Sequence, residues 1–253
     1  MLAQPRAAPA IPANLSERVR ILWIDVTGRP VLRDFDEGVD VAEVFGGRAA
    51  RPFPAWPGKR TFNGWYWCRS TEGMVPFESL FEREAIMVLD FDLAVVDIVA
   101  QPFALLWPRS ASHHFPDLLV RHADGSVAMV DVRPRERIDP QAEHQFALTR
   151  QAADQAGWGY TVYTSSAEPL VSNLTFLAGF RKHCCDPDPE AVKSLRAVFN
   201  PAAALGVGIG WAQSATSSDP RTVRTAALSM LWHQRLHADL TAGPLSDATV
   251  VST

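Results

Sequence analysis

The sequence predicts an α/β fold, with a core in which a helix, three strands, a helix and a strand follow one another. Three observations predict it. Residues 76–89 repeat apolar side chains along one stripe of a helix. Residues 95–133 are rich in β-branched and apolar residues and contain the turn sequence Asp124-Gly125. Residues 139–164 read as a capped helix followed by a strand, and from Glu168 onward the pattern is mostly helical.

Residues 1–60 are expected to form an N-terminal tail and a small hairpin extension. The first dozen or so residues are rich in Ala and Pro, which predicts a disordered tail. Val19–Val26 alternates apolar and polar residues, and a turn at residues 27–30 precedes Val31–Phe35, so a β-hairpin is expected there. Residues 48–60 contain three prolines, which indicates a linker or a surface loop.

Residues 61–166 are expected to form the core. Its aromatic run Trp65-Tyr66-Trp67 is interpreted as the lid of a hydrophobic core rather than as a base-stacking platform. The second helix is marked by Asp139 at its N-cap and by a proline at its first position. The predicted elements are a helix over Pro76–Leu89, a β-prone stretch over Val95–Trp107 with a bend or edge at Pro102, a hairpin of Phe115–His122 and Ser126–Arg133, a helix over Asp139–Ala156 and a strand over Tyr160–Thr164.

Residues 167–253 are expected to form a helical, winged-helix-like C-terminal domain. A Gly-rich break is predicted at residues 206–210, and Arg221–His237 has the pattern of an amphipathic helix. Ala238–Val251 reads as a short strand, a Gly243-Pro244 turn and another strand. A helix followed by a β-hairpin is typical of a winged-helix module.

Composition limits the classes of function. The 253 residues are 47% hydrophobic, enough for one large domain or two modest ones. A formal net charge of −4 provides no global positive field, so DNA binding would need a local patch or a partner. The three cysteines lack metal-ligand spacing, and their odd number argues against a disulfide framework. With no signal peptide and no membrane-spanning stretch expected, the predicted location is the cytoplasm.

Four charged residues suggest a metal-dependent site. Glu82 lies on the first core helix, Asp117 begins one strand of the hairpin, and Asp131 and Arg133 lie at the end of the other. Mg²⁺ prefers carboxylate, water and phosphate oxygens as ligands. A two-residue turn would pair residue 118 with 131 and turn Asp117 away, whereas a three-residue turn at residues 123–125 would pair 117 with 131. The metal site therefore requires the longer turn.

Ordinary structural roles remain open for each residue. Glu82 could be a helix-flank carboxylate, Asp117 could cap backbone amides, and Asp131 could pair with Arg133 or Arg121. Surface positions are expected for His113, His114, His144 and Gln145. The local basic cluster offers a phosphate track, to which Arg121, Arg135 and Arg137 are assigned as candidate contacts.

Several of these motifs together resemble the TnsA-type endonuclease subunit of heteromeric transposases, over about residues 60–164. The matching segments are Phe77–Glu84, Gln101-Pro102, Pro116-Asp117 and Val130–Pro134. The resemblance implies a restriction-endonuclease-like core of the PD-(D/E)XK type. It also implies that Glu82, Asp117 and Asp131 bind Mg²⁺, with Mn²⁺ as a substitute. Arg133 stands where the family pattern has lysine.

The function implied by the resemblance is hydrolysis of one strand at each end of a transposon. Its partners would be double-stranded DNA, a DDE-type transposase subunit and an ATPase regulator contacted by a C-terminal part similar to residues 221–251. Arg133 could stabilise phosphate charge but could not act as a base, because its pKa exceeds about 12. The alternatives are a non-catalytic DNA-binding or assembly subunit with the same fold, and a repair or restriction nuclease.

Overall fold

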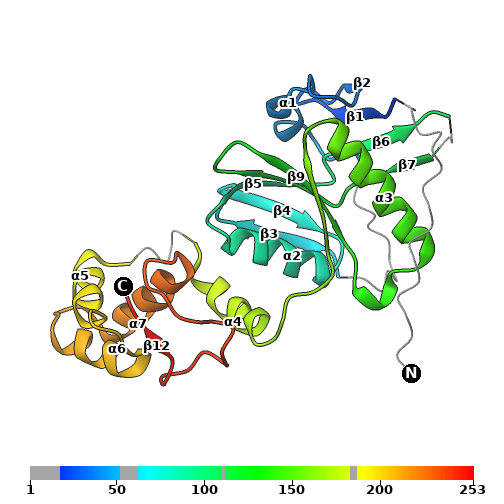
Figure 1. Cartoon of the computed structure of the whole chain (residues 1–253). Helices are drawn as coiled ribbons and strands as arrows, with labels where there is room; N and C mark the ends of the chain where they lie inside the picture. Colours follow the sequence, from blue (N-terminus) through cyan, green and yellow to red (C-terminus); the bar gives the residue numbers. More distant parts are fainter. Residues whose placement is uncertain (1–17, 52–61, 110–111, 183–186) are drawn as a thin grey trace, which may run out of the picture.

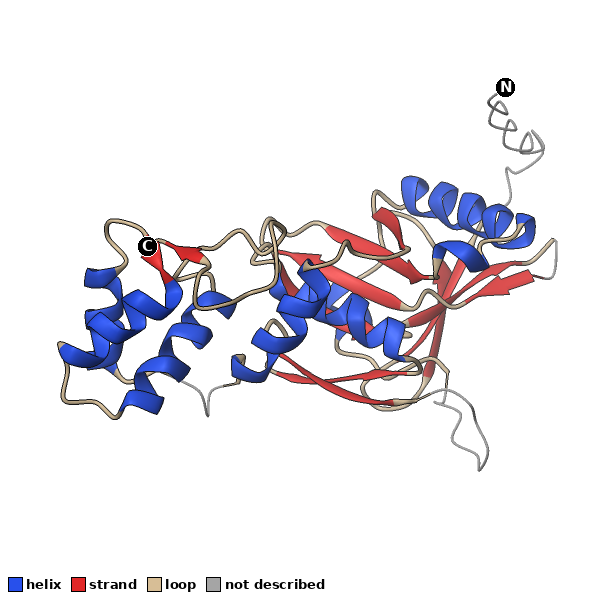
Figure 2. Cartoon of the chain, turned by 90° about the horizontal axis from the view of Figure 1, so that it is seen from below, coloured by secondary structure: helices blue, strands red, loops and turns tan. Residues whose placement is uncertain are grey.

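The computed structural model describes residues 18–51, 62–109, 112–182 and 187–253. The predicted N-terminal tail, most of the predicted linker at residues 48–60, and Cys184 and Cys185 lie outside these residues. The chain folds into a mixed α/β structure, with strands gathered toward one end and the helices of the C-terminal part at the other (Figures 1 and 2). None of the helices in the described ranges is long and apolar enough to cross a membrane.

A four-stranded sheet in the order β5-β8-β9-β10 forms the centre of the core. The strands β5 (Val95–Ala100), β8 (Leu118–His122) and β9 (Val127–Val132) are antiparallel, and β10 (Gly159–Tyr163) runs parallel to β9. The helix α2 (Leu80–Phe91) precedes β5, and α3 (Pro140–Gln155) connects β9 to β10. The predicted order of helix, three strands, helix and strand is therefore present in this sheet and its two helices, although two strands of another sheet lie between β5 and β8 along the chain.

The two helices cover opposite faces of this sheet because the apolar residues of its central strands alternate between them. Leu118, Val120 and Val130 pack in one hydrophobic cluster with buried residues of α2. Leu119 and Met129 pack in a second cluster with residues of α3. Central strands covered on both faces explain why the sequence reads as nearly continuous apolar runs here.

The helix α2 begins later than predicted. Pro76 and Phe77, assigned from sequence to this helix, belong instead to β4 (Gly73–Phe77), which pairs with β3 (Gly64–Cys68). Within this hairpin Tyr66 is buried, as expected for a core lid, whereas Trp65 points outward and is 61% exposed. The aromatic run therefore has two roles, because neighbouring strand residues face opposite sides.

The N-terminal hairpin is confirmed as β1 (Arg20–Ile24) and β2 (Pro30–Asp34), followed by a short helix α1 (Val41–Phe45). This hairpin joins a second sheet, in the order β2-β1-β6-β7, with β6 (Phe103–Trp107) and β7 (Ser112–His114). The segment preceding residue 60 thus completes a sheet shared with the core.

The chain changes sheets at Gln101. The predicted interruption of the β-prone stretch at Pro102 is present, because β5 ends at Ala100 and β6 begins at Phe103, but the two strands belong to different sheets, which the sequence did not indicate. Gln101 has φ of +48°, in the left-handed region that non-glycine residues seldom adopt. Such a conformation costs on the order of 1–3 kcal/mol, which the surrounding contacts must offset.

The C-terminal part is mostly helical, as predicted. Its elements are α4 (Leu170–Leu177), the 3₁₀ turn η2 (Ala178–Phe180), α5 (Pro189–Val198), β11 (Ala203–Ala204), α6 (Leu205–Ser214), α7 (Pro220–Trp232) and β12 (Val250–Val251). It shares a hydrophobic cluster with α2, and Trp232 of α7 packs edge-on against Phe91 with ring centroids 5.3 Å apart.

Three C-terminal predictions need correction. The helix α7 ends at Trp232, not at His237. The predicted hairpin over Ala238–Val251 is reduced to a bridge between His237 and Ser252, and β12 pairs with β11 instead. The Gly-rich segment 206–210 lies inside α6 rather than breaking it. There Gly208 allows close packing, since a Cβ at this position would lie 2.3 Å from the ring of Phe199.

Candidate functional site

The turn between β8 and β9 has the longer form that the predicted site requires. The two strands pair Leu118 with Val130 and Leu119 with Met129, so one further step along this register places Asp117 opposite Asp131. Gly125 adopts φ of +87°, and the N–H of Gly125 and the N–H of His122 close the turn on the carbonyls of His122 and Ser126. The register predicted for the metal site is therefore confirmed.

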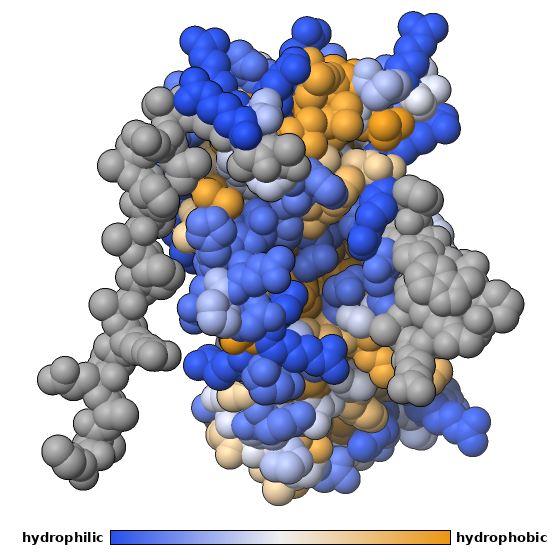
Figure 3. All heavy atoms as spheres, turned by 90° about the vertical axis from the view of Figure 1, so that its right-hand side faces the viewer, coloured by the Kyte–Doolittle hydropathy of each residue, from blue (hydrophilic) through white to orange (hydrophobic). Residues whose placement is uncertain are grey.

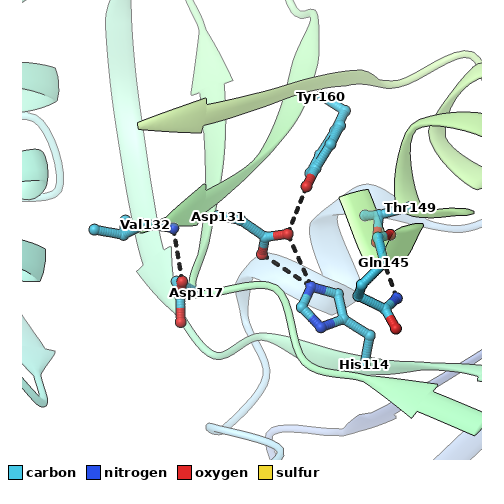
Figure 4. A network of polar contacts seen from close by, with 7 residues as sticks. All are labelled: His114, Asp117, Asp131, Val132, Gln145, Thr149 and Tyr160. Carbon is cyan, nitrogen blue, oxygen red and sulfur yellow. Dashed lines mark hydrogen bonds and ion pairs between the residues drawn. The ribbon is translucent and has the colours of Figure 1, made fainter. Parts of the chain in front are cut away.

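Asp117 is the carboxylic acid most strongly affected by its surroundings. Its Oδ2 accepts a hydrogen bond of 2.7 Å from the backbone N–H of Val132 (Figure 4). Burial, followed by the negative charge of Asp131 and more weakly that of Glu82, raises the pKa of Asp117 to about 7, against the lowering effect of the Val132 N–H. Both other acidic groups are thus near enough to oppose its ionisation.

Asp131 is buried and is hydrogen-bonded to groups that the sequence did not indicate. Its two oxygens each lie 2.9 Å from Nε2 of His114, and the hydroxyl of Tyr160 donates to Oδ2 at 2.6 Å (Figure 4). Arg133 and Arg121, the alternative partners left open for Asp131, contact other groups instead. His114, expected on a surface loop, belongs to β7 and only 20% of its side chain is exposed.

Arg121, the arginine considered both as a partner of Asp131 and as a phosphate contact, contacts other side chains. Arg121 pairs with Asp97 at 2.7 Å, and its guanidinium lies 5.1 Å from the ring centroid of Phe45. Among the remaining candidates, Arg135 and Arg137 are exposed on the 3₁₀ turn η1 (Arg135–Arg137). Of the three arginines predicted to contact phosphate, Arg135 and Arg137 therefore remain as candidates, whereas Arg121 is already paired.

Glu82 caps the helix on which it lies. The hydroxyl of Ser79, the N-cap of α2, accepts from the N–H of Glu82 at 3.1 Å and donates to its Oε1 at 3.0 Å. The N–H of Glu78 donates to Oε2 at 2.8 Å. This is a variant of the capping box, in which a glutamate three residues after the N-cap reaches back to the chain before the helix. Burial raises the pKa of Glu82, and these hydrogen bonds partly oppose the rise.

A polar network behind Glu82 fixes the switch between the two sheets. The side-chain amide of buried Gln101 donates to Glu78 at 3.0 Å, and Arg51 bonds both Gln101 at 3.2 Å and Glu78 at 3.0 Å. The backbone N–H of Gln101 also donates to the carbonyl of Asp117 at 2.8 Å. Gln101 thereby connects the strand end that carries Asp117 to the turn that precedes α2.

Arg133 lies beside a cleft of about 570 Å³ between the start of α2 and the end of β9. Its Nε donates to the carbonyl of Arg137 at 2.8 Å, and one terminal nitrogen is 3.7 Å from Asp139. Glu82 and Arg137 also line the cleft. The structure thus places Glu82 and Arg133 together, while Asp131 faces His114 and Tyr160.

His144 and Gln145 occupy the first turns of α3. His144 is exposed, as expected from the sequence, whereas Gln145 is half-buried and donates to the hydroxyl of Thr149 at 3.3 Å (Figure 4). The face of the molecule at the end carrying β6, β7 and α3 is dominated by hydrophilic side chains around a central hollow (Figure 3).

A preformed cage of three protein ligands is not found in the described ranges: no group of three His, Cys, Asp or Glu residues there is close enough to hold a metal ion. Mg²⁺ usually takes only one or two carboxylates and completes its shell with water and phosphate oxygens. The facing pair Asp117 and Asp131 fits this smaller requirement. Desolvation and, after it, repulsion from Asp131 raise the pKa of Asp117, and a bound cation would oppose both effects by stabilising the ionised carboxylate.

Comparison of the chain with models of protein families gives no match, and comparison with curated proteins gives no match either. The argument about function therefore rests on the residues and on their geometry.

Proposed function

We propose that this protein is a Mg²⁺-dependent DNA endonuclease subunit of a transposition complex. The observation that carries the proposal is the half-buried Asp117 carboxyl group opposite Asp131 in the hairpin register, with a pKa raised to about 7 by desolvation and by neighbouring negative charge. An anionic pair in this position is unfavourable without a cation or strong donors. In a metal-dependent hydrolase such a pair of carboxylates would bind the metal ion.

The fold supports the same proposal. A helix, three antiparallel strands, a helix and a strand parallel to the third is the order of a restriction-endonuclease-like core. In the C-terminal part, the order α5, β11, α6, α7, a bridged segment and β12 is that of a winged-helix module with a very short wing. These likenesses are of topology, and topology alone assigns no activity.

Each residue of the site has a definite role in the proposal. Asp117 and Asp131 would hold the Mg²⁺, which would supply a bound water of lowered pKa and polarise the scissile phosphate. His114 and Tyr160 fix the orientation of Asp131 through their hydrogen bonds. Arg133 binds phosphate oxygens with its guanidinium, whereas Glu82 caps α2 and shapes the wall of the cleft.

A second candidate is a non-catalytic DNA-binding or assembly subunit of the same fold. Two observations favour it. Arg133 cannot accept a proton from water, and Asp131 already accepts hydrogen bonds from two side chains. In both cases the proposed partners are double-stranded DNA, a DDE-type transposase and an ATPase regulator, and the proposed location is the cytoplasm.

Nicking of a supercoiled plasmid carrying transposon ends tests the proposal, with the full-length protein, both partner subunits and Mg²⁺. We expect nicking by the wild type and by Asp124→Asn, a control in the turn of the same hairpin. Asp117→Asn should abolish it. If the wild type binds the DNA with its partners but never nicks it, in Mg²⁺ or Mn²⁺, the non-catalytic function is the correct one.

A further inference from the structure

Two exposed apolar residues line the cleft between the start of α2 and the end of β9. They are Phe62 and Leu80, which are 73% and 54% exposed. Large apolar side chains that stay in water forgo about 25 cal/mol for each Å² they could bury. Because both residues line one cleft, they form a surface suited to a flat apolar group.

Two arginines also line the cleft. They are Arg133 and Arg137, and the hydrogen bond from Nε of Arg133 to the carbonyl of Arg137 fixes the plane of the Arg133 guanidinium. The remaining N–H groups of Arg133 lie on a side chain that is 42% exposed, and one of its terminal nitrogens is 3.7 Å from Asp139. A guanidinium held in this way is suited to two oxygens of a phosphate.

Glu82, which also lines the cleft, does not oppose the binding of a phosphate. Both carboxylate oxygens of Glu82 are engaged, one by the N–H of Glu78 and the other by the hydroxyl of Ser79. The cleft therefore combines positively charged side chains with exposed apolar ones.

We propose that this cleft binds one unpaired nucleotide of the DNA, with its base against Phe62 and Leu80 and its phosphate on Arg133 and Arg137. The inference rests on the proposed function and refines its substrate to DNA that is locally unpaired. A base inside a duplex has both faces stacked on its neighbours, so only an unpaired base presents a face to an aromatic side chain. The volume of about 570 Å³ lies within the range of small-molecule sites, about 300–1,000 Å³.

The charge of the cleft selects this occupant. Aromatic side chains beside arginines are the usual means by which proteins bind single-stranded nucleic acid, with cations tracking the backbone and rings stacking on bases. A purely apolar peptide or lipid chain would offer no anionic group to Arg137 or to Arg133, whose contact with Asp139 spans 3.7 Å. An unpaired nucleotide offers an apolar base and an anionic phosphate together.

The test measures binding of the full-length protein to two fluorescent duplexes of the same sequence, in EDTA so that no cleavage intervenes. One duplex is fully paired, and the other carries a single unpaired nucleotide. We expect the wild type to prefer the unpaired site about tenfold, the scale of one base–aromatic stack. Phe62→Ala should remove most of that preference and leave the affinity for the paired duplex unchanged.

Two further variants locate the effect. Phe176→Ala removes a phenylalanine that is 52% exposed on α4, outside the cleft, and should leave the preference unchanged. Arg133→Ala should weaken binding to both duplexes. If the wild type binds both duplexes equally, or if Phe62→Ala weakens both alike, the inference is overturned while the proposed function stands. If neither duplex binds, the inference is overturned, and the nicking assay with both partner subunits decides the proposed function.

Discussion

The substitution Asp117→Asn should make the protein more stable above pH 7. The wild-type carboxyl has a pKa of about 7 in the folded protein, whereas its ordinary value is 3.8. Between these values the unfolded chain binds fewer protons than the folded one, so the free energy of unfolding falls as the pH rises from about 4 to about 7. Asparagine removes the charge but keeps an oxygen that can accept from the N–H of Val132.

The size of the effect follows from the shift in pKa. Each pKa unit corresponds to about 1.4 kcal/mol, so the rise at Asp117 sets an upper limit of about 4 kcal/mol. Relaxation of the protein around the ionised carboxylate reduces this value. At pH 8 we therefore expect the free energy of unfolding of Asp117→Asn to exceed that of the wild type by about 2–4 kcal/mol. At pH 4 and below the two proteins should be nearly equal, because the wild-type carboxyl is then neutral in the folded state.

Urea denaturation of both proteins at intervals from pH 4 to pH 8 measures this difference directly. Asp124→Asn is the matched control, because hydrogen bonds from Ser126 lower the pKa of exposed Asp124. The ionisation of Asp124 therefore changes the free energy of unfolding only below about pH 4. Above that pH it does not affect the slope of the free energy of unfolding against pH. Parallel stability curves for the wild type and Asp117→Asn between pH 4 and pH 8 would refute the inferred crowding of negative charge.

The remaining predictions concern neighbours of the site. Tyr160→Phe removes the donor to buried Asp131 and should cost about 1.5–3 kcal/mol in urea denaturation, the range for hydrogen bonds to charged groups; a loss under 0.5 kcal/mol would contradict the observed bond. Ser79→Ala should cost about 1 kcal/mol, since it removes both capping contacts with Glu82. Arg133→Ala should lower the slope of log K against log salt by about one for duplex DNA, and an unchanged slope would exclude a phosphate contact.

Added Mg²⁺ separates the two candidate functions without any need for partner subunits. A cation held by Asp117 and Asp131 would bind the folded protein only, and at a concentration one hundred times its Kd it would add about 2.7 kcal/mol of stability. The gain should appear at pH 8 in the wild type and be absent in Asp117→Asn. Equal responses of the two proteins would place the cation elsewhere on the molecule.

The register of the β8–β9 hairpin could be predicted because it depends on local chemistry. Gly125 can adopt the left-handed conformation of a three-residue turn, and that choice alone sets which residues face each other along both strands. The same reasoning fails at Gln101. Contacts with Arg51 and Glu78, which are distant in sequence, hold its left-handed φ. The residues next to Gln101 in the chain therefore do not predict that the chain changes sheets there.

The partner of Asp131 was missed for a related reason. His114 reaches it from β7, a strand of the other sheet, and only the crossing at Gln101 brings the two together. The sequence offered a bound cation or, as the alternative, a neighbouring arginine for this carboxylate, yet a buried carboxylate also needs directed hydrogen-bond donors. The Ser79-x-x-Glu82 pattern, in contrast, was available in the sequence as a capping box. A glutamate already engaged at a helix start can line a cleft without binding a cation, so the acidic residues need not act as one unit.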